Sequence, residues 1–284
     1  TTEGTGFDGR VLIVEDNLVN QEVAVGMLEH LGCRWETAAD GQRALQMAAS
    51  EHFDVILMDC EMPVMDGMEA TRRIREFEAA TAGSPDRPAR RTPIVALTAH
   101  ALNEIQGACE AAGMDDFMTK PFDEAQLVRA LSRWMKPIYR PEAPAATPAV
   151  AVEAPAQRPE GDVEASPLDL IVVNKLRERD RPERPSRFAK LVGQFAEIMP
   201  ALLMDIEMSA DNGDLERLWR GAHSMKSSAG ALGALKLAAR CAEIETAGRD
   251  GREDELHDLC RHLEHDVNAA IDALNALLPL RQAS

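Results

Sequence analysis

Between residues 10 and 136 the sequence alternates short apolar runs with segments of helical periodicity, and this alternation constrains the fold more than any other feature. It is typical of a parallel β-sheet covered by helices. Buried parallel strands are continuous runs of Val, Ile and Leu, and three such runs are clear while two others are weaker. We therefore predict an α/β doubly wound domain with five parallel strands at residues 11–14, 34–38, 55–58, 94–97 and 116–119. Helices are expected at 22–31 and 123–134, and an exposed loop at 79–93.

The composition changes after this region. Residues 137–167 are rich in Pro, Ala and Glu, which predicts a semi-extended linker. From Leu168 onward the pattern is helical, with interruptions at Pro182, Pro185 and Gly213 and near residues 248–251. These interruptions leave one short helix and about four longer ones, enough for an antiparallel bundle. We predict a first domain at residues 8–136 and an all-α four-helix bundle at residues 168–280.

Polar side chains stand where the predicted strands end. Glu15 and Asp16 follow the first strand, and Asp59 follows the third. Thr98 and Lys120 follow the fourth and fifth strands. Ligands of open α/β sheets bind beyond the carboxyl ends of the strands, so we expect these five residues to converge. Three carboxylates in one place repel one another unless a cation neutralises them, which predicts a Mg²⁺ site.

The same set of residues suits phosphoryl chemistry. Lys120 supplies a positive charge and Thr98 a hydroxyl donor for incoming phosphate oxygens. A carboxylate can attack phosphorus and form an acyl phosphate, and Asp59 is the candidate nucleophile. A strand end or a helix cap would account for any one of these acids, but it does not account for the whole set.

Four segments of the first domain resemble the motifs of response-regulator receiver domains: VLIVEDN at 11–17, MDCEMPVMDG at 58–67, LTA at 97–99 and TKPF at 119–122. The resemblance covers about residues 8–136 and implies the flavodoxin-like receiver fold. It implies that Asp59 is phosphorylated and that Glu15 and Asp16 bind Mg²⁺ together with Asp59 and the backbone carbonyl of Glu61.

The resemblance also assigns roles around the phosphoryl group. It implies that Thr98 and Lys120 contact the phosphoryl oxygens, and that Phe117 occupies the position of an aromatic switch residue. An ordinary packed side chain is the competing interpretation of Phe117. Glu61 and His100 fall at positions that tune the lifetime of the phosphoryl group in this family.

A second candidate residue, His223, lies in the helical region. An apolar stripe at spacings of three and four faces the bundle core, and His223 is about 100° away from it, which predicts a position at the edge of the stripe or in solvent. Arg220 and Lys226 lie within one turn and can support a phosphate on the imidazole. Ser227 and Gly230 are small and leave clearance for a docking partner. The apolar stripe consists of Leu215, Leu218, Ala222, Met225, Ala229 and Leu232.

The segment AHSMKSSAGALGA at 222–234 resembles the active-site helix of histidine-containing phosphotransfer domains, in a resemblance that spans about residues 168–280. It implies that His223 is the phosphorylated residue and that a docked receiver supplies the metal and the acids. The two domains together resemble the C-terminal part of hybrid sensor histidine kinases. This implies two partners: a histidine kinase as phosphodonor, in another protein or upstream in the same polypeptide, and a downstream response-regulator receiver that docks on His223.

Several function classes are disfavoured by composition. A net charge of −17 argues against nucleic-acid binding, which needs clustered Lys and Arg. No apolar stretch reaches the length of a membrane span and no leader is recognisable, so we expect no membrane contact from this segment and a cytoplasmic location, as a free protein or as the tail of a membrane-bound sensor. The chain begins with Thr1 rather than Met, which suggests that it continues a longer protein. The five cysteines contain no C-x-x-C pair and are expected to be reduced thiols.

Two other functions remain as alternatives. Phosphatases of the haloacid dehalogenase type also form an aspartyl phosphate, but they carry a second Asp two residues later, where this sequence has Glu61. A docking module whose phosphorylation controls partner affinity, without onward transfer, fits the sequence as well. No ATP-binding kinase region or P-loop is recognisable, so the phosphoryl source lies outside this chain.

Overall fold

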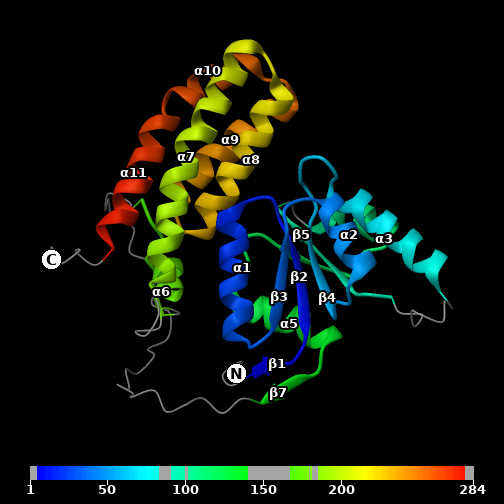
Figure 1. Cartoon of the computed structure of the whole chain (residues 1–284). Coiled ribbons are helices and arrows are strands. Elements are labelled where there is room, and N and C mark those ends of the chain that lie inside the picture. Colours follow the sequence, from blue (N-terminus) through cyan, green and yellow to red (C-terminus); the bar gives the residue numbers. More distant parts are fainter. Residues whose placement is uncertain are drawn as a thin grey trace.

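The structure is a computed structural model that describes residues 5–82, 91–99, 102–139, 167–178, 180 and 185–278. Most of the loop predicted at 79–93 and of the linker predicted at 137–167, together with His100, lies outside the described residues. The described part consists of an N-terminal α/β region and a C-terminal helical region (Figure 1).

The α/β region contains the predicted five-stranded parallel sheet. Its strands are β2 (Arg10–Val14), β3 (Arg34–Ala38), β4 (Val55–Asp59), β5 (Ile94–Thr98) and β6 (Asp116–Thr119), in the order β3-β2-β4-β5-β6. Because the chain passes from β2 to β3 on one side and then returns to β4 on the other, β2 and β4 flank the point where the strand order reverses. That reversal opens a crevice at their carboxyl ends.

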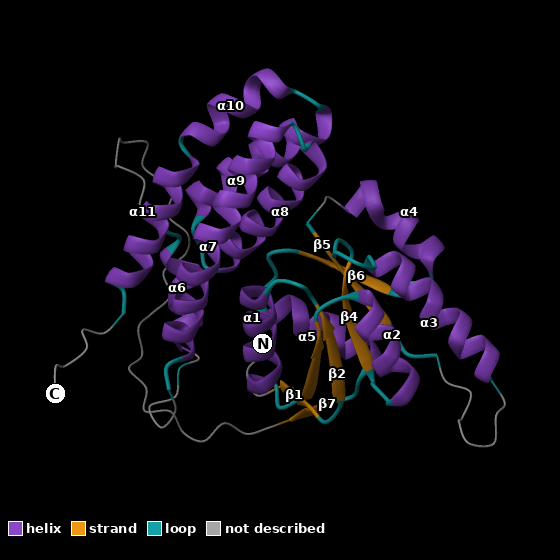
Figure 2. Ribbon diagram, turned by 45° about the horizontal axis from the view of Figure 1, so that its top comes forward, coloured by secondary structure: helices purple, strands orange, loops and turns teal. Residues whose placement is uncertain are grey.

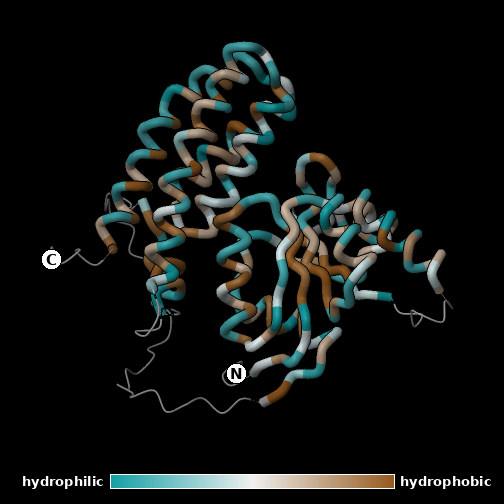
Figure 3. Tube along the Cα trace, viewed as in Figure 1, coloured by the Kyte–Doolittle hydropathy of each residue, from teal (hydrophilic) through white to brown (hydrophobic). Residues whose placement is uncertain are grey.

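Helices cover both faces of this sheet (Figure 2). The helices α1 (Leu18–His30) and α5 (Glu124–Trp134) pack on one face. The other face carries α2 (Gly41–Ser50), α3 (Gly67–Thr81) and α4 (Leu102–Ala112). Alternate strand residues serve the two cores: Ile13 and Leu57 point toward α1, whereas Leu12 and Ile56 point to the other side. The inner strands β2, β4 and β5 are therefore apolar on both sides, and the inner part of the sheet is coloured hydrophobic in Figure 3.

Two short strands were not predicted. β1 (Thr5–Phe7) and β7 (Pro137–Tyr139) pair antiparallel and form a separate two-stranded sheet. They lie just outside the predicted range 8–136 and bring the two ends of the α/β region together. Strands of three residues are too short to show a hydrophobic period, so no pattern in the sequence indicated them.

The C-terminal region is the predicted all-helical bundle. It begins with the short α6 (Leu170–Glu178), followed by α7 (Arg187–Asn212), α8 (Leu215–Ala231) and α9 (Leu235–Asp250). Gly213 and Gly251 end α7 and α9 in the left-handed conformation, which glycine adopts without strain. The last helical segment, expected to be continuous, is divided at His262 into α10 (Glu253–Arg261) and α11 (Leu263–Ala276).

The two regions pack against each other through α1, which lies beside α7 and α8 (Figure 1). One hydrophobic cluster continues from α1 and α5 into the bundle. Ion pairs flank it: Arg187 Nη2 lies 2.5 Å from Glu29 Oε2, and Lys190 Nζ lies 2.5 Å from Glu22 Oε1. A Cβ atom at Gly26 would stand only 3.0 Å from Arg187 Nη1, so a glycine on α1 allows this close approach.

Within the part of the chain that the structure describes, no helix combines the length and the apolar character needed to cross a membrane.

Candidate functional site

The three predicted acids meet at the carboxyl edge of the sheet. Glu15 and Asp16 follow β2, and Asp59 is the last residue of β4. One carboxylate oxygen from each lies within 4.8 Å of the others. Asn17 caps α1 immediately afterwards, because its Oδ1 accepts hydrogen bonds from the backbone N–H groups of Val19 and Asn20. The cap turns the chain away directly after Asp16 and so fixes both acids at the edge.

Lys120 joins this cluster from the end of β6. Its Nζ lies 2.5 Å from Glu15 Oε2 and 2.7 Å from Asp59 Oδ2. The Lys120 backbone N–H donates to the carbonyl oxygen of Thr98 at 2.7 Å, which holds the ends of β5 and β6 side by side. Thr98 is almost completely buried. All five residues predicted from the strand ends therefore stand on the same edge of the sheet.

The charges of the cluster are not balanced by the protein alone. Burial raises the pKa of Asp59 to about 7, although the Lys120 ammonium opposes the shift. Burial, with the charge of Glu15, raises the pKa of Asp16 to about 6. Burial alone would lower the pKa of Lys120, but the carboxylates of Asp59 and Glu15 raise it. One ammonium thus faces three carboxyl groups, and such an all-oxygen set fits Mg²⁺.

Glu61 links the cluster to the helical bundle. Its backbone N–H donates to Asp59 Oδ1 at 3.3 Å. Its side chain turns away from the acids toward the bundle, where Oε2 lies 2.7 Å from Arg249 Nη2 and 3.6 Å from His223 Nδ1. The sequence predicts that Glu61 supplies a backbone carbonyl ligand for the metal and occupies a position that tunes the phosphoryl lifetime, but the contact of its side chain with the bundle was not predicted.

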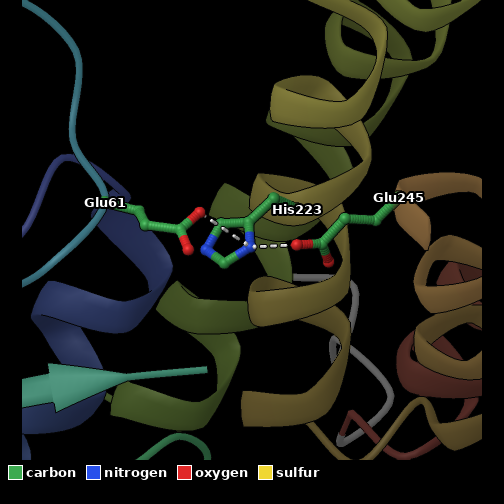
Figure 4. A group of neighbouring side chains, drawn as sticks. All are labelled: Glu61, His223 and Glu245. Carbon is green, nitrogen blue, oxygen red and sulfur yellow. Dashed lines mark hydrogen bonds and ion pairs between the residues drawn. The ribbon is translucent and has the colours of Figure 1, made fainter. Parts of the chain in front are cut away.

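His223 lies on α8 between two carboxylates, Glu61 and Glu245 (Figure 4). Its Nδ1 is 3.0 Å from Glu245 Oε1 on α9. The residue is only 8% exposed, so the prediction of a solvent-exposed histidine is wrong, whereas a position at the edge of the apolar stripe agrees with the structure. Helical periodicity places His223 correctly off the apolar stripe of α8, but α9 and the loop after β4 cover it from both sides.

The network around Glu245 fixes the state of the imidazole. Lys226 Nζ lies 2.5 Å from Glu245 Oε2, and Arg249 Nη2 lies 3.0 Å from Oε1. Burial alone would raise the pKa of Glu245, but the hydrogen bond with His223 and the charge of Lys226 lower it to about 2. A carboxylate beside Nδ1 favours the tautomer in which Nδ1 carries the proton and donates a hydrogen bond. The lone pair is then on Nε2. In Figure 4 this second nitrogen lies on the side of Glu61, toward the α/β region.

Asp59 and His223 line the same cavity, which has a volume of about 360 Å³. Glu15, Asp16 and Lys120 line it from the α/β region. Trp219, Arg220, Ser224 and Ser227 line it from α8.

The other predicted residues take up different positions. Arg220 lies at the wall of this cavity but pairs with Glu216 on its own helix, at 2.7 Å. Lys226 pairs with Glu245 rather than standing free beside the imidazole. Phe117 is partly buried against the hydrophobic cluster under α2, α3 and α4.

Two asparagines of the α/β region bind α8 directly. Asn17 Nδ2 donates to Ser228 Oγ at 2.7 Å and contacts Ser224 Oγ at 3.0 Å. Asn20 Nδ2 donates to Ser227 Oγ at 2.8 Å. The small serines of α8 therefore form hydrogen bonds with the α/β region, in addition to leaving room for it to approach.

The sequence did not reveal these contacts, nor those of Glu245 and Arg249. An N-cap motif predicts only the local role of Asn17. The spacing of one helix likewise says nothing about the helix that packs against it.

Comparison with known proteins agrees with this division. A family model described as the response regulator receiver domain matches residues 11–132, and a model of the Hpt domain matches residues 190–276. The sensor histidine kinase GacS of Pseudomonas protegens is 37% identical over 160 residues, which cover 56% of this chain and 16% of that protein. Probable histidine kinase 2 of Oryza sativa is 44% identical over 147 residues, covering 46% of this chain and 13% of its own length. The chain thus spans a small part of the curated relatives it matches.

Two solved structures are also similar. One is the receiver domain of the sensor histidine kinase PA1611 from Pseudomonas aeruginosa with a magnesium ion in its active-site cleft, 46% identical, with a TM-score of 0.39 over 45% of this chain and 97% of that one. The other is the co-crystal structure of the Saccharomyces cerevisiae phosphotransfer protein Ypd1 with the receiver domain of Ssk1, 31% identical, with a TM-score of 0.43 over 45% of this chain and 90% of that one.

Proposed function

The chain contains a response regulator receiver domain at residues 11–132 and an Hpt domain at residues 190–276, and from this premise we propose that Asp59 and His223 exchange a phosphoryl group within one chain. The two domains belong to two-component phosphorelay signalling, as they do in the hybrid histidine kinases to which the chain is similar. The observation that carries the proposal is the cavity that both residues line.

The exchange needs an acceptor nitrogen with a free lone pair. With the proton on Nδ1, His223 donates a hydrogen bond to the Glu245 carboxylate, so the lone pair and the nucleophile are on Nε2. Nε2 attacks the phosphorus of an acyl phosphate on Asp59, the bond between phosphorus and the Asp59 oxygen breaks, and its electron pair returns to the carboxylate. The imidazole gains positive charge in this step, and the carboxylates of Glu245 and Glu61 beside it stabilise that charge. The reverse reaction uses the same groups and loads Asp59 from a phosphohistidine.

The acids would hold the metal. Glu15, Asp16 and Asp59, with the backbone carbonyl of Glu61, form the proposed Mg²⁺ site. Mg²⁺ bound there would neutralise the carboxylates and the charge of the phosphoryl oxygens. Lys120 lies 2.7 Å from Asp59 Oδ2, which supports a role in binding a phosphoryl oxygen next to that atom. Thr98, at the end of the neighbouring strand, is proposed to donate a hydrogen bond to a second phosphoryl oxygen.

Partners of the whole protein follow from the same chemistry. We propose that a histidine kinase loads Asp59 and that a separate response-regulator receiver takes the phosphoryl group from His223. The receiver domain of the same chain covers His223 in the docked arrangement. The separate receiver therefore reaches His223 when the two domains of this chain move apart. Phosphate from an ATP-dependent kinase is supplied in the cytoplasm, which is the proposed location.

The test uses a radiolabelled small acyl phosphate as donor, with Mg²⁺, so that no cognate kinase is required. Label on nitrogen survives alkali, whereas an aspartyl phosphate does not, and this separates the two products. The variants are Asp59→Asn and His223→Gln, with His30→Gln as the control because His30 is an exposed histidine on α1.

We expect alkali-stable label in the wild type and in His30→Gln, and none in either other variant. Alkali-stable label of wild-type intensity in Asp59→Asn would contradict the proposal. Label that reaches Asp59 but never nitrogen would favour the docking module without onward transfer.

A further inference from the structure

Two cysteines that the phosphoryl chemistry does not use are in contact beside the phosphoacceptor. Cys60 directly follows Asp59 at the end of β4, and Cys109 lies in the last turn of α4. Their Sγ atoms are 3.8 Å apart, which is van der Waals contact for sulfur. Both side chains are buried, and the residues belong to the hydrophobic cluster between the sheet and α2, α3 and α4. The two cysteines are 49 residues apart in the sequence, so the absence of a C-x-x-C motif gave no hint of this pair.

We propose that Cys60 and Cys109 form a reversible disulfide in the presence of a peroxide, and that this disulfide slows the phosphorylation of Asp59. Formation of the disulfide is argued from the contact of the two sulfur atoms. The effect on phosphorylation rests on the proposed function, because it takes Asp59 as the phosphoacceptor.

A small oxidant can reach the pair. Cys60 lines the cavity of about 360 Å³ that Asp59 and His223 share, so a peroxide that enters this space arrives at this residue, whose Sγ contacts Cys109 Sγ. Either thiol can donate its proton to the other sulfur. This contact lowers the pKa of Cys109, so the thiolate of the pair is Cys109, whose Sγ lies 3.8 Å from Cys60 Sγ.

The oxidation is balanced by hydrogen peroxide alone. The thiolate of the pair attacks one peroxide oxygen, the O–O bond breaks, and the leaving hydroxide takes up a proton to become water. The other thiol then attacks the sulfur of the resulting sulfenic acid. The S–S bond forms, and the hydroxyl leaves with the thiol proton as a second water. Two thiols and one peroxide thus give one disulfide and two waters, and a dithiol reductant reverses the change.

The disulfide would disturb the phosphoacceptor because of where Cys60 is attached. An S–S bond of about 2.05 Å requires the two sulfur atoms to approach by roughly 1.8 Å from their present contact. The backbone of Cys60 is held on both sides, since its N–H donates to Leu97 O at 3.0 Å and its carbonyl accepts from Gly67 N at 3.2 Å. A pull on this residue is transmitted to Asp59 before it and Glu61 after it. Displacement of a reacting group by about 1 Å slows a reaction up to about 100-fold.

The first measurement identifies the bond. The full chain is treated with a small excess of hydrogen peroxide, the remaining thiols are alkylated, and the protein is digested without reductant and analysed by mass spectrometry. We expect a peptide pair linked through Cys60 and Cys109 that disappears after treatment with dithiothreitol. Cys109→Ser removes the pair, and Cys33→Ser is the matched control, because Cys33 is also a buried cysteine of the same domain but lies in the turn between α1 and β3. Oxidation of the two cysteines only as separate sulfinic acids would overturn the proposal.

The second measurement is the rate at which Asp59 is phosphorylated by a small acyl phosphate with Mg²⁺. We expect this rate to fall about 10-fold to 100-fold after oxidation in the wild type and in Cys33→Ser, and to be insensitive to peroxide in Cys109→Ser. Equal rates in the oxidised and reduced wild type would overturn the regulatory effect. His223 takes no part in this readout, so a failure of intrachain transfer leaves the result of this experiment intact.

Discussion

The ion pair between α1 and α7 offers a sensitive test of how the two domains dock. Arg187 is 25% exposed and Glu29 is 35% exposed in this pair, so its contribution is that of a partly exposed salt bridge, about 0.5–1 kcal/mol. Glu29→Arg removes this attraction and replaces it with a repulsion of similar size. The docked arrangement then loses about 1–2 kcal/mol, a factor of roughly 5 to 30 in the docking equilibrium.

The assay is the rate at which phosphate moves from a pre-labelled Asp59 to His223, followed by rapid quenching. We expect Glu29→Arg to slow this step by up to about 30-fold and the double variant Glu29→Arg with Arg187→Glu to recover most of the loss. Glu69→Arg is the matched control, because Glu69 pairs only with Arg72 and Arg73 of its own helix in the described structure. The reasoning is refuted if Glu29→Arg transfers at the wild-type rate, or if the double variant is no faster than Glu29→Arg alone.

Three further outcomes are expected. Glu245→Ala removes the hydrogen-bond acceptor for Nδ1–H of His223 and should slow phosphohistidine formation about 10-fold to 100-fold. The circular dichroism spectrum should not change. A wild-type rate would exclude a role of Glu245 in positioning the imidazole. Gly67→Ala would bring a Cβ atom to 2.0 Å from the Asp59 carbonyl oxygen and should lower the free energy of unfolding by about 1–3 kcal/mol in urea titrations, where an unchanged midpoint would contradict the tight packing. Burial raises the pKa of Asp59 from 3.8 to about 7, so the metal-free protein should lose stability as the pH rises between these values. Mg²⁺ should lower that pKa because it favours the carboxylate, and carboxyl NMR titration with and without Mg²⁺ checks the direction.

The sequence predicted well that Glu15, Asp59 and Lys120 meet at one edge of the sheet, because its signals are local. The inner strands β2, β4 and β5 contain continuous apolar runs, and each candidate residue follows a predicted strand by one or two positions. Parallel strands bring their carboxyl ends to one edge whatever the details of packing, so Glu15, Asp59 and Lys120 converge even though they lie far apart in the chain. The fold class and this half of the site follow from periodicity and chain direction.

The environment of His223 could not be predicted in the same way. Its helix face is encoded in the spacing of α8, but its burial depends on Glu245 from α9 and Glu61 from the receiver. Neither residue has a fixed sequence distance from the histidine. The same holds for the pair of Arg187 with Glu29, which lie 158 residues apart. Contacts between separately folded units depend on surface complementarity, and a single sequence carries no local signal for it.

The concentration dependence of His223 phosphorylation tests directly the claim that Asp59 serves the histidine of its own chain. Asp59 is labelled first, excess donor is removed, and the transfer is followed at increasing dilution. Intrachain transfer predicts a first-order rate that does not change on dilution, and a mixture of Asp59→Asn with His223→Gln that forms little phosphohistidine when dilute. A rate that falls in proportion to protein concentration, with a mixture that transfers as well as the wild type, would contradict the claim.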